Sequence, residues 1–204
     1  HKEYEIKEIR IFSNYIKKFN ITDFIDIGAN CGYYTFYLTD KFSELKTLSF
    51  EPNNDAFEKL CFSHKKNKKN KKNINVFNYG FSDTNSLLKM RALKKNNHVQ
   101  SGGSTVTNKK DLADNEIIFT ANFKIGDQVL NFQNKKIAIK IDVEGHEINV
   151  LKSLENTLKQ NKIVIQIEIF DDNFFAVNNF FENIEYKLIF KIKDSLNYYY
   201  SNIK

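Results

Sequence analysis

The sequence has little cysteine, a single proline and no long apolar run, and these absences narrow what the protein can be. Its two cysteines, Cys31 and Cys61, supply neither a disulfide framework nor a cluster of metal ligands. We interpret both as small buried hydrophobic residues in a reducing compartment. No apolar run approaches the roughly 20 residues that a membrane-spanning helix needs, and no secretory signal opens the chain. We therefore expect a cytoplasmic protein without a membrane span.

The length of the chain favours a single folded unit. It has 204 residues, of which 41% are hydrophobic, and its 19 phenylalanines can contribute to a substantial core. We expect an N-terminal helix within residues 1–20 and one domain over residues 21–204, with an insert at about residues 85–133. The chain begins with His1 rather than Met, so we also expect a trimmed chain or a piece of a longer protein.

The positive charge of the chain is concentrated in one segment. The formal net charge is +6, and residues 65–72 read Lys-Lys-Asn-Lys-Lys-Asn-Lys-Lys. Such a run could contact nucleic acid or an anionic surface. However, no aromatic residue lies between the lysines to stack on a base. We therefore interpret the run as a solvated helix end and loop, and we do not expect nucleic acid as a partner.

The most informative stretch is residues 24–35, Phe-Ile-Asp-Ile-Gly-Ala-Asn-Cys-Gly-Tyr-Tyr-Thr. It predicts a short strand that ends near Asp26, a tight glycine turn, and a helix that opens near Gly32. Glycine lets a ligand approach the main chain closely. The spacing Asp-x-Gly-x-x-x-Gly is neither the dinucleotide fingerprint nor a P-loop. It fits the S-adenosylmethionine (SAM) turn of a Rossmann-like methyltransferase, although an ordinary strand-turn-helix would also explain it.

A second acid follows at the spacing that a nucleoside ligand requires. Glu51 ends a predicted strand about 20 residues beyond the glycine turn, where a carboxylate can accept the ribose hydroxyls. Pro52 restricts Glu51 to extended geometry. After a third strand at residues 74–79, Phe81 is a candidate to cover the adenine or, equally, to be a core residue. The residues expected to bind SAM are Asp26, Gly28, Asn30, Gly32, Glu51, Pro52, Asn53, Phe81 and Asp142.

The second chemical centre is the segment Ile-Ala-Ile-Lys-Ile-Asp-Val-Glu-Gly-His-Glu at residues 137–147. It predicts a strand that ends near Asp142 and a helix that opens at Gly145, which places Asp142, Glu144 and His146 at the carboxyl edge of the sheet. We expect these three residues to surround an acceptor hydroxyl, with His146 or Glu144 as the general base.

A further acid, Glu168, lies near the end of a buried strand at residues 163–170 and needs a partner. With Asp142 it could hold a divalent metal such as Mg²⁺, which prefers oxygen ligands. In the metal-free alternative, Glu168 pairs with Lys140 or a backbone donor and His146 takes the proton. Because side chains alternate along a strand, Lys140 and Asp142 should point to the same face.

Alternating strand and helix signals predict the fold class, an α/β Rossmann-like domain. We expect a seven-stranded, mostly parallel sheet with helices on both faces and an antiparallel final hairpin at residues 186–192 and 197–203. The amphipathic helix at residues 3–19 should cover one edge of the sheet. The pattern over residues 85–133 is weak, with a flexible turn at residues 101–105 and His98 as a surface histidine, so we expect an irregular lid or substrate loop.

Together these segments resemble the FkbM family of SAM-dependent O-methyltransferases. The matching pieces are residues 26–35, 50–53, 140–147 with 150–152 after them, and 167–169, in family order over roughly residues 21–192. The resemblance implies a class I methyltransferase fold, a cytoplasmic location and methylation of a sugar or polyketide hydroxyl, often in surface-polysaccharide or natural-product biosynthesis. The lysine run and the insert depart from the family pattern and leave the acceptor open.

Three functions compete at this point. The leading interpretation is an O-methyltransferase that acts on a sugar, a glycan or another small hydroxyl acceptor, such as a natural product. A nucleic-acid methyltransferase that modifies amino groups would carry an Asn/Asp-Pro-Pro-aromatic motif where this chain has residues 142–145, Asp-Val-Glu-Gly. A non-catalytic SAM-binding module is the third, and acids at three strand tips argue against it. The oligomeric state is open.

Overall fold

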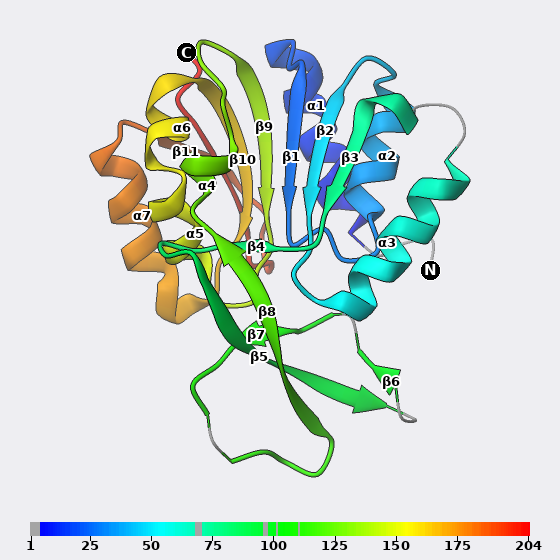
Figure 1. The fold of residues 1–204 in the computed structure, drawn as a ribbon. Coiled ribbons are helices and arrows are strands. Elements are labelled where there is room, and N and C mark those ends of the chain that lie inside the picture. The colour runs from blue at the N-terminus through cyan, green and yellow to red at the C-terminus, as the bar shows by residue number, and fades with distance from the viewer. Residues whose placement is uncertain (1–4, 68–70, 96–97, 101, 110) are drawn as a thin grey trace.

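The computed structural model describes residues 5–67, 71–95, 98–100, 102–109 and 111–204, and Figure 1 shows a layered α/β unit with a projecting β hairpin below it. The main sheet has seven strands in the order β11-β12-β10-β9-β1-β2-β3. Neighbouring strands from β10 to β3 run parallel, whereas β12 is antiparallel to both β10 and β11. The predicted fold class is therefore confirmed. The strands are β1 (Asp23–Ile27), β2 (Lys46–Phe50), β3 (Ile74–Phe77), β9 (Lys136–Ile141), β10 (Lys162–Glu168), β11 (Lys187–Lys191) and β12 (Asn197–Ser201).

Helices cover both faces of this sheet, as the sequence predicts (Figure 1). The N-terminal helix buries Ile9, Phe12 and Ile16 in a cluster with Phe24 of β1 and Tyr199 of β12. This helix therefore packs on a face of the sheet, and the expectation that it covers an edge is wrong. The helices are α1 (Ile6–Phe19), α2 (Tyr33–Lys41), α3 (Asn54–Lys66), α4 (Gly126–Val129), α5 (Glu147–Ser153), α6 (Glu155–Gln160) and α7 (Phe174–Asn183), with 3₁₀ turns η1 (Lys71–Asn73) and η2 (Asp171–Asn173).

The other face of the sheet packs against α5, α6 and α7. The single helix that the apolar stripe after Gly145 predicts is broken at Leu154, where α5 ends and α6 begins. The stripe itself is retained, because Leu151, Leu154 and Leu158 are fully buried against the sheet. The two short helices thus bury the same side chains that one continuous helix would.

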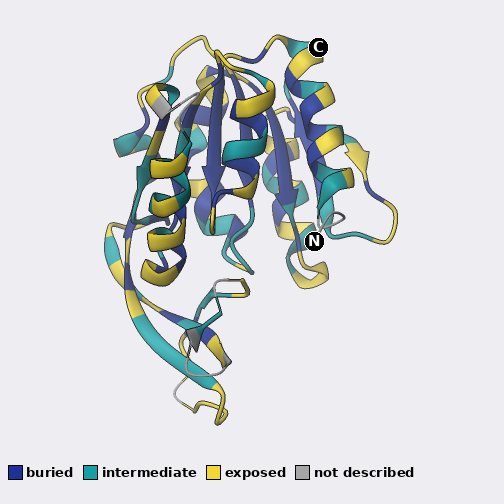
Figure 2. Ribbon diagram, turned by 90° about the vertical axis from the view of Figure 1, so that its right-hand side faces the viewer, coloured by how far each residue is buried: buried dark blue, intermediate teal, exposed yellow. Residues whose placement is uncertain are grey.

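The described part of the insert contains regular strands, so the expectation of an irregular connection is wrong. β5 (Ser86–Lys95) and β8 (Glu116–Lys124) form a long antiparallel pair, joined by the short strands β4 (Gly80–Phe81), β6 (His98–Val99) and β7 (Thr105–Val106). Figure 2 shows this hairpin as a thin arm with exposed and half-buried residues below the buried sheet. Its own small cluster consists of Met90, Ala121 and Phe123, which alternate along the strands toward one face.

Three other expectations can be compared with the structure. Cys31 is exposed and Cys61 is half-buried, so the interpretation of both as buried residues is wrong, and both are free thiols. Residues 68–70 of the lysine run and Ser101 lie outside the described residues, as does the side chain of His98. Among the described residues, no helix is long and apolar enough to cross a membrane.

Candidate functional site

The carboxyl ends of β1, β2 and β9 meet at one edge of the sheet, because these strands are parallel neighbours. The loops that follow them surround a pocket of about 670 Å³, part of which is open to solvent. Eight of the predicted site residues line this pocket: Gly28, Asn30, Glu51, Pro52, Phe81, Asp142, Glu144 and His146. The other four, Asp26, Gly32, Asn53 and Glu168, are not among its lining residues.

The glycine turn is shaped by two close approaches of the backbone. Gly28 has a φ of 78°, and a Cβ atom there would lie 1.8 Å from the carbonyl oxygen of Asp142. Gly32 has a φ of 91°, and a Cβ atom there would lie 2.3 Å from the ring of Phe36. Glycine is thus required at position 28, because the loop after β1 approaches the loop after β9 closely there. At position 32 it is required by packing at the start of α2.

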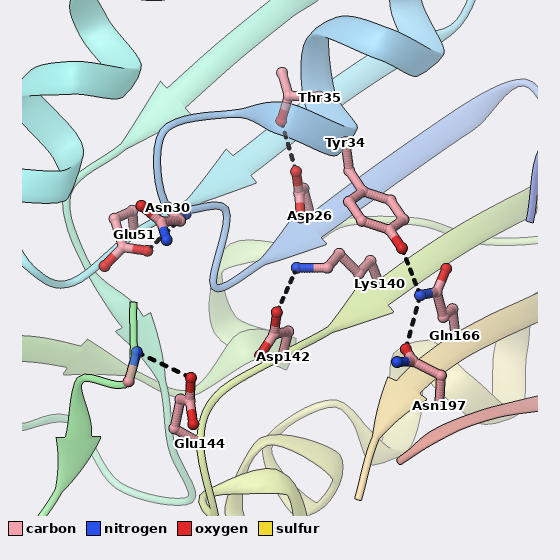
Figure 3. Close-up of polar contacts among 11 residues, drawn as sticks. Asp26, Asn30, Tyr34, Thr35, Glu51, Lys140, Asp142, Glu144, Gln166 and Asn197 are labelled. Atoms are coloured by element: carbon pink, nitrogen blue, oxygen red, sulfur yellow. Dashed lines mark hydrogen bonds and ion pairs between the residues drawn. The ribbon is translucent and has the colours of Figure 1, made fainter. Parts of the chain in front are cut away.

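Two backbone amides hold the carboxyl group of Glu51, one from the loop after β1 and one from the loop after β2. Its Oε2 accepts a hydrogen bond from the amide of Asn30 at 2.8 Å, and its Oε1 accepts one from the amide of Asn53 at 2.8 Å. Burial raises the pKa of Glu51 to about 7, and the two N–H donors oppose that rise. Asn53 also caps α3 by accepting from the amide of Asp55 at 2.9 Å. The predicted ribose acceptor is therefore fixed in place within the pocket wall (Figure 3).

Asp26 lies beneath the glycine turn rather than in the pocket. It is fully buried, and its Oδ2 accepts a hydrogen bond from the hydroxyl of Thr35 at 2.7 Å. Its Oδ1 has no hydrogen-bond partner among the described residues. The register aligns Asp26 with Ser49 of β2 and with Lys140 of β9, so a row of polar side chains crosses the sheet under α2. Asp26 therefore contributes to this buried row.

Lys140 and Asp142 point to the same face of β9, as the alternation along a strand predicts. The Nζ of Lys140 lies 2.9 Å from Oδ2 of Asp142 (Figure 3). Burial alone would lower the pKa of Lys140, but the charges of Asp142 and Asp26 outweigh it and hold that pKa above its ordinary value. Burial would likewise raise the pKa of Asp142, but Lys140 and a hydrogen bond from Glu168 keep it low. Asp142 is therefore an anion.

Glu168 shares a hydrogen bond with Asp142 rather than with Lys140. Burial, together with the negative charge of Asp142, raises the pKa of Glu168 to about 8, so it carries a proton at neutral pH. These two carboxyl groups are the predicted magnesium ligands. An ammonium group already occupies one oxygen of the pair, and no group of three or more His, Cys, Asp or Glu residues suited to a metal occurs in the described ranges. The residues therefore do not fit a divalent metal.

Phe81 belongs to the core as well as to the pocket. Its side chain is 1% exposed, and its ring centroid lies 4.5 Å from that of Phe50. It is also among the residues that line the pocket. Both of the roles considered from the sequence are thus compatible with its position.

His146 faces the pocket from the N-terminal end of α5. Its Nε2 lies 3.0 Å from the hydroxyl of Ser82, which donates to Oδ1 of Asp83 at 3.2 Å. Its ring packs edge-on against Phe123 with centroids 5.7 Å apart. Burial lowers the pKa of His146, and the charge of Asp83 opposes that shift only in part. The imidazole is therefore neutral at physiological pH and can accept a proton.

Several pocket residues come from the insert and were not predicted from the sequence. Met90, Val106 and Phe123 provide an apolar wall, and Gly103 and Ser104 lie beside them. A period-two alternation of apolar residues in β5 and β8 is the signal that could have identified the strands. Their approach to the main sheet depends on contacts across the fold, which alternation alone does not predict.

A parallel sheet with a glycine turn after its first strand, an acid after its second and an acidic loop after its fourth defines a class of proteins, the Rossmann-like methyltransferases. Comparison with known families agrees: the profile of the methyltransferase FkbM domain matches residues 26–199. The chain therefore belongs to the FkbM family of SAM-dependent methyltransferases, and the resemblance seen in the sequence is confirmed. No curated protein matches the chain in sequence.

Solved structures share this fold at low sequence identity. A methyltransferase FkbM from Methylobacillus flagellatus aligns with a TM-score of 0.62 and 13% identity, covering 89% of this chain and 44% of that one. A precorrin-6y C5,15-methyltransferase from Geobacter metallireducens aligns with a TM-score of 0.53 and 12% identity, covering 96% and 86%. A tRNA methyltransferase from B. subtilis aligns with a TM-score of 0.52 and 14% identity, covering 95% and 63%. The chain thus spans less than half of the Methylobacillus protein.

Proposed function

We propose that this protein transfers a methyl group from SAM to a hydroxyl of a sugar or glycan, in the cytoplasm and in the biosynthesis of a surface polysaccharide. The observation that carries the proposal is one pocket that brings together the glycine turn, the carboxylates of Glu51 and Asp142, and the neutral imidazole of His146. We also propose that residues 21–204 form one catalytic domain, with the insert at about residues 85–133 contributing to the acceptor site.

The lining of the pocket suits SAM in charge. A cofactor with a sulfonium and an ammonium group favours a site rich in carboxylates, and Asp142 is an anion. Glu51 supplies oxygens for the ribose hydroxyls, and Gly28 lets the ligand approach the backbone. We assign Asn30 and Pro52 to the same site.

His146 is the general base in this proposal. When bound, SAM supplies a methyl group activated by its sulfonium. The donation from Ser82 to Asp83 leaves the Ser82 oxygen free to accept from Nε2 of His146. In that tautomer Nδ1 is the basic nitrogen of the ring. The methyl group would pass from the sulfonium of bound SAM to the acceptor oxygen, and Nδ1 of His146 would take the hydroxyl proton.

Asp142 contributes a negative charge to the pocket. It does not take the proton, because Lys140 keeps the pKa of Asp142 low. Glu144 also lines the pocket, but its carboxylate accepts a hydrogen bond from the amide of Gly103 at 3.0 Å. That contact makes it a weaker candidate for the base than His146. We propose no step through Mg²⁺, since the ammonium of Lys140 already pairs with Oδ2 of Asp142 and Glu168 is protonated.

A second acceptor class is favoured by two observations, the net charge of +6 and the likeness of the fold to a tRNA methyltransferase. Against it, the anionic Asp142 lines the pocket and would repel a phosphate backbone. We therefore retain the hydroxyl of a sugar or glycan as the leading acceptor, and a small natural product is compatible with the same pocket.

The test is a methyl-transfer screen with radiolabelled SAM, preceded by calorimetry of SAM binding. Sugar nucleotides, oligosaccharides, phenolic natural products and total tRNA serve as separate acceptor pools, and the variant His146→Ala is the matched control. We expect label in the sugar pools as an alkali-stable ether, and a large loss of it in the variant. Label in the tRNA pool alone would replace the glycan proposal, and SAM binding without transfer to any pool would favour a binding module.

A further inference from the structure

One short segment of the insert lies at the pocket, where Gly102, Gly103 and Ser104 are among the lining residues. Residues 103–105 form hydrogen bonds both with Asn53, in the loop after β2, and with Glu144, in the loop after β9, and these strands flank β1 on either side. The segment therefore passes over the end of β1, where the glycine turn lies. A Cβ atom on Gly102 would lie 4.0 Å from the side-chain amide nitrogen of Asn30 in that turn. We name residues 102–105 the strap.

Three hydrogen bonds fasten the strap, and they come from both sides of the pocket. On the β2 side, the side-chain amide of Asn53 donates to the hydroxyl of Ser104 at 2.9 Å. On the β9 side, the amide of Gly103 donates to Oε1 of Glu144 at 3.0 Å, as Figure 3 shows. The hydroxyl of Thr105 donates to the carbonyl oxygen of Glu144 at 2.6 Å. Glu144 thus receives the strap with both its side chain and its backbone.

The backbone conformation of Glu144 supports a functional role for this contact. Its φ is 53°, in the left-handed region that residues other than glycine adopt rarely. Such strain persists only where the surrounding structure holds it, and it is common at ligand clamps. Gly103, which contacts Glu144, has a φ of 73°, and among the described residues no atom lies within 4 Å of the position of a Cβ there. The strap is therefore held by Glu144, whereas the space beside the Cα atom of Gly103 is open.

The strap is weakly held compared with the sheet beneath it. Gly102 and Gly103 are exposed, and the strap is connected to the hairpin through β7, whose Thr105 and Val106 pair with β5. Segments with few buried contacts open locally at low free energy. Three side-chain contacts can therefore form and break while the main sheet remains intact.

We propose that the strap closes over bound SAM, with Glu144, Ser104 and Thr105 as positioning residues, and that its opening limits release of the cofactor product. This inference rests on the proposed SAM site. It gives Glu144 a role distinct from that of a base. Closing the strap places the apolar wall of the insert, including Met90 and Val106, against the pocket and excludes water from the reacting atoms.

The experiment compares the parent with Ser104→Ala/Thr105→Val, which removes two of the fastening bonds and leaves Glu144 unchanged. Thr120→Val, at an exposed position on β8, is the matched control for loss of a threonine hydroxyl in the insert. Glu144→Ala is a second variant with the same expected effect. The two readouts are the dissociation rate constant of S-adenosylhomocysteine and hydrogen–deuterium exchange of the amides at residues 102–106.

We expect the double variant and Glu144→Ala to release S-adenosylhomocysteine about tenfold faster than the parent, with faster exchange in the strap. Binding of the ligand should slow strap exchange in the parent. Faster exchange with an unchanged dissociation rate, or no change in either readout, overturns the strap proposal alone. A parent that does not bind S-adenosylhomocysteine overturns the SAM site and the strap together, so the two failures are distinguishable.

Discussion

Lys140 forms an ion pair with Asp142 at 2.9 Å and aligns in register with Asp26 on the neighbouring strand. One buried ammonium group thus faces two carboxyl groups, one in the pocket and one beneath the glycine turn. Its position under the ring of Tyr34, 4.9 Å from the centroid, leaves it little access to solvent. Lys140 therefore compensates the negative charge of Asp142 at the pocket and also contributes to the stability of the sheet.

The first prediction follows from this buried charge. Lys140→Met should lower the free energy of unfolding by about 3–5 kcal/mol, because Asp142 and Asp26 would lose their cation in a buried setting. Urea unfolding measures the loss. Lys136→Met, at an exposed position on the same strand, is the matched control and should change stability by less than about 0.5 kcal/mol. Equal effects of the two variants would contradict the role of the ion pair.

The second prediction concerns pH. The pKa of Glu168 is raised from 4.5 to about 8 in the folded protein, so between these values the folded state binds more protons than the unfolded state. Stability contributed by this proton is present at low pH and is lost as the pH rises through that window. Relative to Glu168→Gln, the parent should thus become less stable from pH 5 to pH 8 in chemical denaturation. Parallel curves for the two proteins would show that Glu168 does not hold the proton.

The third prediction tests the ribose site. Glu51→Ala should weaken SAM binding by about 2–4 kcal/mol, because two charge-assisted hydrogen bonds to the ribose are lost. Isothermal titration calorimetry gives the affinity. Thermal unfolding must be followed in parallel, since Glu51 also accepts from the amides of Asn30 and Asn53. A folded variant with the affinity of the parent would remove Glu51 from the cofactor site.

The fourth prediction concerns the base. Once an acceptor is found, His146→Ala should lower kcat by about 10²–10⁴-fold with little change in the affinity for SAM. In the parent, the pH–rate profile should rise with an apparent pKa below the ordinary value of His, because burial lowers it. His146→Ala should lose that inflection. Retention of the inflection in the variant would assign the base to another group.

The fifth prediction concerns metal. Methyl transfer should be insensitive to a chelator, and added Mg²⁺ should not raise the melting temperature, because Lys140 holds the oxygen of Asp142 that a cation would use. Differential scanning calorimetry with and without Mg²⁺ provides the measurement without an acceptor. A rise that depends on Mg²⁺ and disappears in Asp142→Asn would reinstate the metal site.

The sequence by itself determined the main sheet and those pocket residues that lie at the ends of its strands. Strand tips carry their own local signals, such as the glycine turn that Gly28 requires and the proline that extends Glu51. Parallel strands bring their carboxyl ends to one edge, so Asp142 and His146 could be placed beside that turn from order alone. Alternation along one strand was enough to put Lys140 and Asp142 on the same face.

Only the tertiary structure decided which partner each of these groups has. Whether Glu168 meets a metal, Lys140 or Asp142 depends on side-chain packing between β9 and β10, and no local pattern encodes it. The same holds for the strap, because Gly103 and Glu144 are separated by 41 residues and meet only when the hairpin folds back. Long-range contacts of this kind are set by the packing of the whole chain. For this reason the sequence alone predicted an irregular loop for the insert.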